Sequence, residues 1–97
     1  MAGSWPSWSS FGLDLVTFRV FVAAVEERSL ARAAARERLA LSALSRRITD
    51  LEARSGVPLL IRHDRGVEPT AAGEALVVQL RNVFTLLQRV ARMCGMA

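Results

Sequence analysis

Four polar side chains share one side of an expected helix from about Leu41 to Arg54, opposite an apolar stripe. Each residue turns a helix by about 100°, so residues three and four apart lie on the same side. The polar side holds Ser42, Ser45, Arg46 and Thr49, and the apolar side holds Leu44, Ile48 and Leu51. Hydroxyls and a guanidinium hydrogen-bond to base edges and phosphates, whereas a helix that only faces water more often carries Glu and Lys. The helix is therefore expected to bury its apolar side and to present its polar side to DNA.

Positive charge is concentrated on this helix and on the segment before it. All 13 basic residues are Arg, against 9 acidic residues, for a formal net charge of +4. Residues 28–47 hold six of these Arg and one acidic residue, Glu37, so this segment alone carries +5. A localised positive surface favours a polyanionic partner. A solvated helix face is the alternative if the charge is considered alone.

Two further helices are expected before the polar one. Apolar residues at intervals of three and four mark an amphipathic helix from about Asp14 to Glu27, with Asp14 suited to its N-terminus. Ser29 is a candidate N-cap for a second helix from Leu30 to about Arg38. The third helix ends at Ser55-Gly56, where glycine commonly lets the chain turn left-handed. The second and third helices, joined by a tight turn, have the pattern of a helix-turn-helix.

A small β-hairpin is expected directly after the third helix. Residues 57–62 form a β-prone run, residues 63–66 a polar turn, and residues 67–69 a second short strand. Pro58 and Pro69 lie at the edges of the hairpin, where a missing N–H does not break the ladder. A hairpin in this place corresponds to a wing.

A long helix capped by Thr70 is expected from Ala71 to about Met93. Its apolar residues recur at alternating intervals of three and four, which is heptad spacing. The stripe consists of Leu76, Leu80, Val83, Leu87, Val90 and Cys94, and it is widened by Val77, Phe84 and Ala91. It is wider than one small domain covers, which predicts a homodimer through this helix. The alternative is that the stripe folds back onto its own core.

Length and composition limit the class of protein. A chain of 97 residues with 52% apolar content forms one small globular unit. Residues 1–13 lack the charged start and apolar core of a signal peptide and are expected to be a flexible leader. No apolar run approaches the roughly 20 residues needed to span a bilayer. With one Cys and one His, no disulfide or zinc site is expected within the chain, and we predict a cytoplasmic protein without metal, cofactor or small-molecule ligand.

Two other classes of function compete with DNA binding. An enzyme is disfavoured because Ser45 has no neighbouring general base, Cys94 lies on the dimer stripe and the carboxylates are scattered. His63, in the expected turn, is more simply a solvated side chain. A helical protein-interaction or dimerisation module without specific DNA binding remains open, with its Arg residues as solvated surface. An unchanged DNA affinity on removing Arg46 would favour that class.

In order along the chain, these segments resemble the DNA-binding region of LysR-type transcriptional regulators. The resemblance covers Leu15 to about Val90. Its segments are residues 21–23 with Glu26, 29–34, 43–48 with 51–52, 56–60 with Arg62, 65–67 and 70–73. It implies a mainly α, bacterial, nucleoid-associated module: a winged helix-turn-helix over residues 14–70, followed by a dimerising linker helix over residues 71–97. Members also carry a large effector-binding domain, which is not expected within these 97 residues.

The resemblance also implies which residues contact DNA. It places Ser42, Ser45 and Arg46 in the major groove, Ala31 and Arg32 near the DNA backbone, and Arg65 in the minor groove. The full expected set is Ala31, Arg32, Leu41, Ser42, Ser45, Arg46, Arg47, Thr49, Arg62 and Arg65.

Two departures from the family pattern affect these expectations. Ala40-Leu41-Ser42 stands where many members have Ser-Gln-Pro, which removes a hydroxyl N-cap and an amide that commonly contacts a base. Glu37 stands where a Leu often packs. Base preference and the packing of the second helix are therefore expected to differ from the family pattern.

Overall fold

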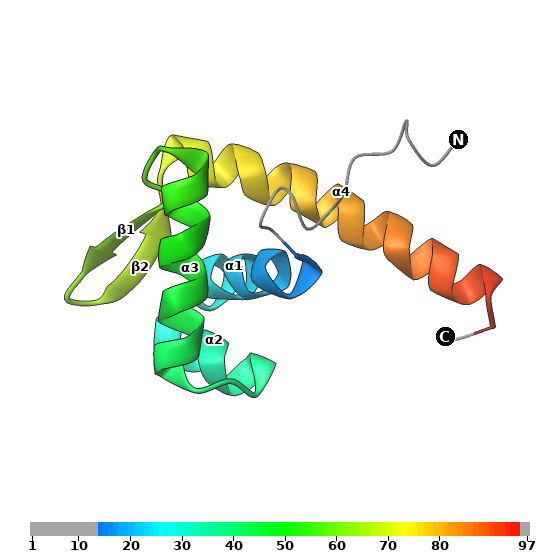
Figure 1. The fold of residues 1–97 in the computed structure, drawn as a ribbon, viewed down its shortest axis with the longest axis horizontal. Coiled ribbons are helices and arrows are strands. Elements are labelled where there is room, and N and C mark those ends of the chain that lie inside the picture. Colours follow the sequence, from blue (N-terminus) through cyan, green and yellow to red (C-terminus); the bar gives the residue numbers. More distant parts are fainter. Residues whose placement is uncertain (1–13, 96–97) are drawn as a thin grey trace.

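The six expected elements are all present, in the expected order, in a computed structural model that describes residues 14–95. The expected leader, residues 1–13, lies outside the described residues. The elements are α1 (Leu15–Glu27), α2 (Leu30–Glu37), α3 (Leu41–Ser55), β1 (Leu60–His63), β2 (Gly66–Pro69) and α4 (Ala71–Met93). Figure 1 shows α1 between the helix-turn-helix and α4, which runs away from the body. The fold is thus the mainly helical one that the sequence predicted.

Local side-chain caps account for the start of three helices. The side chains of Asp14, Ser29 and Thr70 each accept the backbone N–H three residues later, at 2.8, 3.1 and 3.0 Å. Such a cap stabilises a helix by about 1 kcal/mol. Helix α3 starts after Ala40 without a side-chain cap, as its sequence predicted, and ends at Gly56 with φ 75°. The helix that carries the polar face therefore depends on its packing more than the other three do.

The core is built around α1, four of whose residues have no exposed surface. They are Val20, Phe21, Ala23 and Ala24. Ala33 of α2 and the apolar side of α3, Leu44, Ile48 and Leu51, pack against them at 0 to 2% exposure. Because Ala23 and Ala33 carry only methyl groups, the α1 and α2 backbones can approach closely. The two-sided character predicted for α3 is confirmed.

The first strand of the hairpin starts at Leu60, three residues later than predicted. Pro58 has no N–H to donate, and the N–H groups of Leu59 and Leu60 go to one carboxylate oxygen of Glu52, at 2.7 and 3.1 Å. The antiparallel ladder then runs from Leu60 opposite Pro69 to His63 opposite Gly66. Helix α3 therefore holds the base of the hairpin through a side chain.

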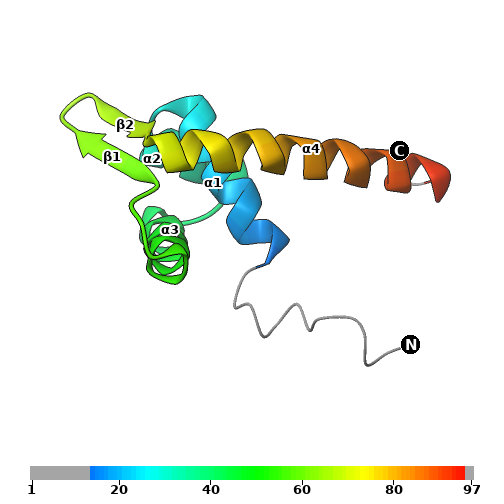
Figure 2. The ribbon, with the colours of Figure 1, turned by 90° about the horizontal axis from the view of Figure 1, so that it is seen from above.

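The second strand is fixed to the turn between α1 and α2. The Val67 N–H donates to the Arg28 carbonyl at 3.1 Å. Gly66, at φ 133°, lies so close that a Cβ there would be 2.1 Å from the same oxygen. The hairpin is thereby seated on the body of the domain, and its tip projects away from the direction of α4 (Figure 2).

Helix α4 divides into an anchored half, residues 71–82, and a free half, residues 83–93, most of which is exposed. Val77 and Leu80 are buried at 3 and 5% exposure, and Leu76 and Phe84 pack partly against the same core. Leu80 was expected in the dimer stripe, but α4 crosses α1 at this point, so Leu80 belongs to the core of its own chain. The C-terminal end of α4 extends away from the body (Figures 1 and 2). No helix within residues 14–95 is both long enough and apolar enough to cross a membrane.

Candidate nucleic-acid interface

The polar face of α3 is open to solvent. Ser42, Arg46 and Thr49 are exposed and Ser45 is half-buried. Leu41, at the first turn of the helix, is 49% exposed. The N-terminal half of α3 thus presents hydroxyls, one guanidinium and one apolar side chain together.

The start of α2 and the hairpin add further exposed groups. Ala31 and Arg32 are exposed on the first turn of α2, and Arg62 and Arg65 are exposed on the hairpin. In the turn, the Arg65 backbone N–H donates to Nδ1 of His63 at 3.2 Å, which gives the imidazole a structural partner. Within residues 14–95, the guanidinium groups of Arg32, Arg46, Arg62 and Arg65 form no ion pair. Four positive groups are thus available for phosphates.

Arg47 differs from the other expected DNA contacts because it bonds to α1. Its Nη1 donates to Oγ1 of Thr17 at 3.0 Å and to Oδ1 of Asp14 at 3.3 Å. The cause is helical phase, since Arg47 lies about 100° around α3 from Arg46 and faces the start of α1. The N–H of Thr17, together with its hydroxyl and the charge of Arg47, outweighs burial and lowers the pKa of Asp14. The geometry therefore places Arg47 in the α1–α3 contact, and its expected contact with DNA stays a prediction.

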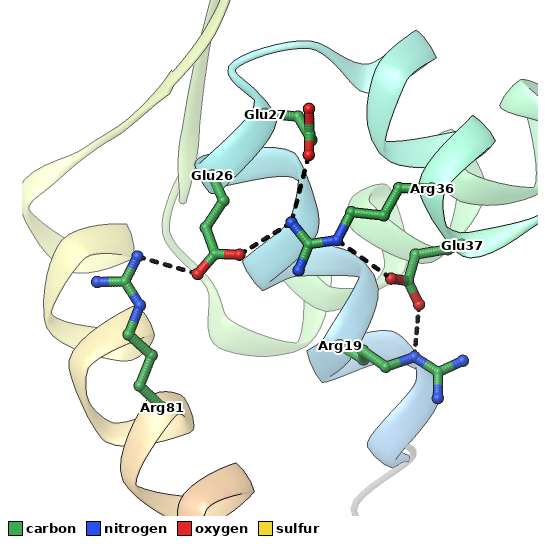
Figure 3. A network of polar contacts seen from close by, with 6 residues as sticks. All are labelled: Arg19, Glu26, Glu27, Arg36, Glu37 and Arg81. Carbon is green, nitrogen blue, oxygen red and sulfur yellow. Dashed lines mark hydrogen bonds and ion pairs between the residues drawn. The ribbon is translucent and has the colours of Figure 1, made fainter.

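An ion-pair network joins α1, α2 and α4, and its pairings were not predicted (Figure 3). The Glu37 side chain is only 9% exposed and pairs with Arg19 of α1 and with Arg36, whose Nε lies 3.7 Å from it. Nη1 of Arg36 also contacts Glu26 at 2.9 Å and Glu27 at 3.4 Å. The carboxylate that replaces a packing Leu in the family pattern is therefore held between two guanidinium groups. No spacing rule finds such a pair, because Arg19 and Glu37 are 18 residues apart.

The network and the Arg47 contact change the charge available to a polyanion. Of the six Arg in residues 28–47, Arg36 and Arg47 are paired with carboxylates of the same chain. Glu37, the one acid in this segment, is also paired. The positive surface is therefore narrower than composition suggested and lies on the exposed parts of α2, α3 and the hairpin.

Protonation of Glu26 at low pH should lower the free energy of unfolding. Burial alone would raise the pKa of Glu26, but hydrogen bonds from Arg36 and Arg81 and their charges outweigh it, so its pKa lies below its ordinary 4.5. At pH values above the ordinary pKa, the ionised Glu26 carboxylate stabilises the folded state. This stabilisation is lost as the pH falls through the lowered pKa of Glu26. We expect the free energy of unfolding to fall less for Glu26→Gln than for wild type between about pH 6 and 3.5.

Urea unfolding at both pH values checks this expectation. Glu68→Gln is the control, because Glu68 is exposed and forms no ion pair within residues 14–95. The same loss in wild type and Glu26→Gln would show that Glu26 contributes nothing to acid stability.

Three helices with a hairpin beside the third, followed by a long helix, define a winged helix-turn-helix domain with a C-terminal extension. Residues 15–74 match the sequence profile of bacterial regulatory helix-turn-helix proteins of the lysR family. The chain therefore belongs to the lysR family, and this part of it is the DNA-binding domain of a LysR-type regulator rather than an enzyme.

Relatives and solved structures agree with this membership. A probable cat1 operon transcriptional activator of Acinetobacter lwoffii is 46% identical over 78 residues, which is 80% of this chain and 26% of that protein. The regulator PgrR of Escherichia coli (strain K12) is 47% identical over 64 residues, or 66% of this chain and 21% of that protein. The chain thus spans about a quarter of the length of these relatives.

Two similar structures were solved as complexes with DNA. The BenM DNA-binding domain on catB site 1 DNA superposes with a TM-score of 0.82 at 32% identity, covering 86% of this chain and 92% of that one. The CbnR DNA-binding domain on DNA has a TM-score of 0.79 at 32% identity, covering 86% and 95%. The similarity extends over most of the described residues.

Proposed function

We propose that this chain binds double-stranded DNA specifically, as a homodimer, in the bacterial cytoplasm. In this proposal residues 14–70 bind DNA and residues 71–97 link two copies. The observation that carries it is the exposed polar face of α3, with Ser42 and Arg46 opposite a fully buried apolar stripe. DNA-bound structures of similar domains add support.

In this arrangement the N-terminal half of α3 enters the major groove. Arg46 donates two hydrogen bonds to a guanine edge, and Ser42 and Ser45 contact neighbouring base edges. The exposed Leu41 contacts a thymine methyl group, since it has no amide with which to reach a base. Thr49, one turn beyond Ser45, reaches the sugar-phosphate backbone.

Groups outside α3 fix the orientation of the domain. Arg32 contacts a phosphate from the first turn of α2, where the small side chain of Ala31 lets the backbone approach DNA. Arg62 contacts the backbone from β1. Arg65, beside the hairpin turn, reaches the minor groove, where a guanidinium gains most over narrow A·T-rich sequences.

The second copy covers the free half of α4. Val83, Leu87 and Val90 are 40, 38 and 53% exposed and lie within about 60° of one another around the helix. Leu86 and Met93 extend the same apolar side at 56 and 86% exposure. Two copies joined here hold two heads on one face of the duplex, about one or two helical turns apart.

Replacing Arg46 tests the major-groove assignment. The specific site is first selected from a random DNA pool, and affinities are then measured for that site and for random DNA. Arg46→Ala should lose about 1 to 3 kcal/mol more on the selected site than on random DNA, because base contacts are lost only there. Arg92→Ala, on the exposed end of α4, removes the same charge and should change both affinities little.

The other outcomes are equally informative. Equal losses on both DNAs would make Arg46 a phosphate contact. Unchanged affinity on both, with little dependence on salt, would favour the protein-interaction module, since each phosphate contact contributes roughly −0.9 to the log–log salt slope.

A further inference from the structure

The carboxylate of Glu26 bridges two helices that belong to different parts of the molecule. Its Oε1 lies 2.9 Å from Nη1 of Arg36 on α2, and its Oε2 accepts a hydrogen bond from Nη2 of Arg81 on α4 at 3.2 Å. Figure 3 shows Glu26 between the two guanidinium groups, with Arg36 in turn reaching Glu27 and Glu37. One side chain of α1 thus connects the helix-turn-helix to the long helix.

The bridge lies where α4 leaves the body of the domain. Arg81 follows Leu80, which is 5% exposed, and Phe84 packs partly against the core about one turn farther along the helix. From Val83 to Met93, most of the apolar side chains are exposed. Glu26 and Arg81 therefore form a polar contact between the helix-turn-helix and α4 close to the start of the exposed half.

Two open grooves flank the bridge, so side chains do not pack closely on either side of it. One groove of about 550 Å³ lies between the end of α1, β2 and α4, and another of about 670 Å³ lies between α1, α2 and α4. Glu26 and Arg81 line both grooves. Because side chains are not close-packed on either side, α4 has room to tilt about its buried contacts unless polar contacts hold it.

A small tilt at Arg81 becomes a large displacement at the end of α4. The 12 helical steps from Arg81 to Met93 span about 18 Å at 1.5 Å per residue. A tilt of about 10° over this length moves the helix end by about 3 Å, which is close to the 3.4 Å rise of one base pair. In a dimer joined through this half, such a shift changes the spacing of the two DNA-binding heads.

We infer that Glu26 is a positioning residue whose bridge from Arg36 to Arg81 fixes the direction of α4 relative to the helix-turn-helix. Its consequence for DNA is that the bridge sets which separation of two half-sites the dimer accepts. That consequence rests on the proposed function, whereas the direction of α4 is a property of the chain without DNA.

The direction of α4 is measured first, in the full chain without DNA. Nitroxide labels are placed on Cys94, at the end of α4, and on Ala53→Cys, an exposed position of α3. The labelled chain is diluted with unlabelled Cys94→Ser chain, and the distance distribution is recorded by double electron–electron resonance. Dilution leaves only distances within one chain.

Four further variants are compared in this background. Glu26→Gln and Arg81→Gln should each broaden or shift the distribution by about 3 Å. Arg81→Lys keeps a donor for Glu26 and should restore most of the wild-type distribution. Arg92→Gln is the matched control, because it loses the same charge 11 residues along α4, on nearly the same side, where no ion pair forms within residues 14–95.

The second readout is half-site spacing. Affinities are measured for two half-sites at the preferred separation and at one base pair more or less. Glu26→Gln should reduce the preference between these sites at least 3-fold while binding to a single half-site is retained.

Distributions of Glu26→Gln and Arg81→Gln that superpose on wild type, in chains that unfold cooperatively, would overturn the inference. An altered distribution in a chain that binds no DNA would retain the positioning role and reject the proposed function instead. If Glu26→Gln fails to fold, Arg81→Gln on the exposed side of the bridge decides the same question.

Discussion

Leu87→Glu is expected to convert the proposed α4 dimer into a monomer. Leu87 lies between Val83 and Val90 on the free half of α4, and its side chain loses water when a second copy covers it. A carboxylate in the interface between the two α4 helices would lose its water without gaining a hydrogen-bond or charge partner. This costs several kcal/mol, which a short interface does not offset. Binding to two half-sites should then weaken by about 10²- to 10⁴-fold, because the two heads no longer bind as one linked unit.

Sedimentation equilibrium measures this result directly. Gln88→Glu adds the same charge at the neighbouring position, about 100° around the helix, and should leave the dimer intact. Both variants should keep the helix content of wild type, since both positions are exposed in the single chain. A wild-type chain that stays monomeric at about 100 μM would contradict dimerisation through α4 and, with it, the linked binding to two half-sites.

The helices and their ends were predictable because their determinants are local. Asp14, Ser29 and Thr70 accept N–H groups three residues along, and Gly56 takes a left-handed conformation, all of which short stretches of sequence specify. The two-sided character of α3 follows from the same periodicity. The polar face of the candidate interface was therefore visible in the sequence before any tertiary contact was known.

The long-range contacts were not predictable from such patterns. Arg47 bonds to Asp14, 33 residues away, and Arg81 bonds to Glu26, 55 residues away. Which Arg side chains face carboxylates depends on how the helices cross, and composition counts all of them as available charge. The sequence accordingly predicted neither the contact of Arg47 with Asp14 nor the Glu26 bridge.

The apolar stripe of α4 shows the same limit in another form. Its heptad spacing combined two sets of residues whose centres lie roughly 90° apart around the helix. Val77, Leu80 and Phe84 face the core of their own chain, whereas Val83, Leu87 and Val90 remain exposed. Periodicity located both sets on one helix but carried no information on where α4 leaves α1.

Gly73→Ala is expected to destabilise the fold through the junction between the hairpin and α4. Gly73 is buried in the first turn of α4, and a Cβ there would lie 2.1 Å from the Leu59 carbonyl oxygen and 3.3 Å from Cβ of Pro69. The nearest atom belongs to the backbone, so no side-chain rotation relieves the overlap. Overpacking of this kind costs about 1 to 3 kcal/mol, and a backbone clash lies at or above the upper end.

Urea unfolding of the variant beside Ala72→Ser isolates this cause. Ala72→Ser also adds one heavy atom to the first turn of α4, but at an exposed position, and should change the free energy of unfolding by less than about 0.5 kcal/mol. Because Leu59 also accepts the Thr70 N–H through the same carbonyl, a shifted Leu59 should weaken the start of α4 and the base of the hairpin together. Hydrogen exchange should therefore speed up at the N–H groups of Leu60 and Thr70 in Gly73→Ala but not in Ala72→Ser. Wild-type stability in Gly73→Ala would show that α4 does not approach the Leu59 carbonyl this closely.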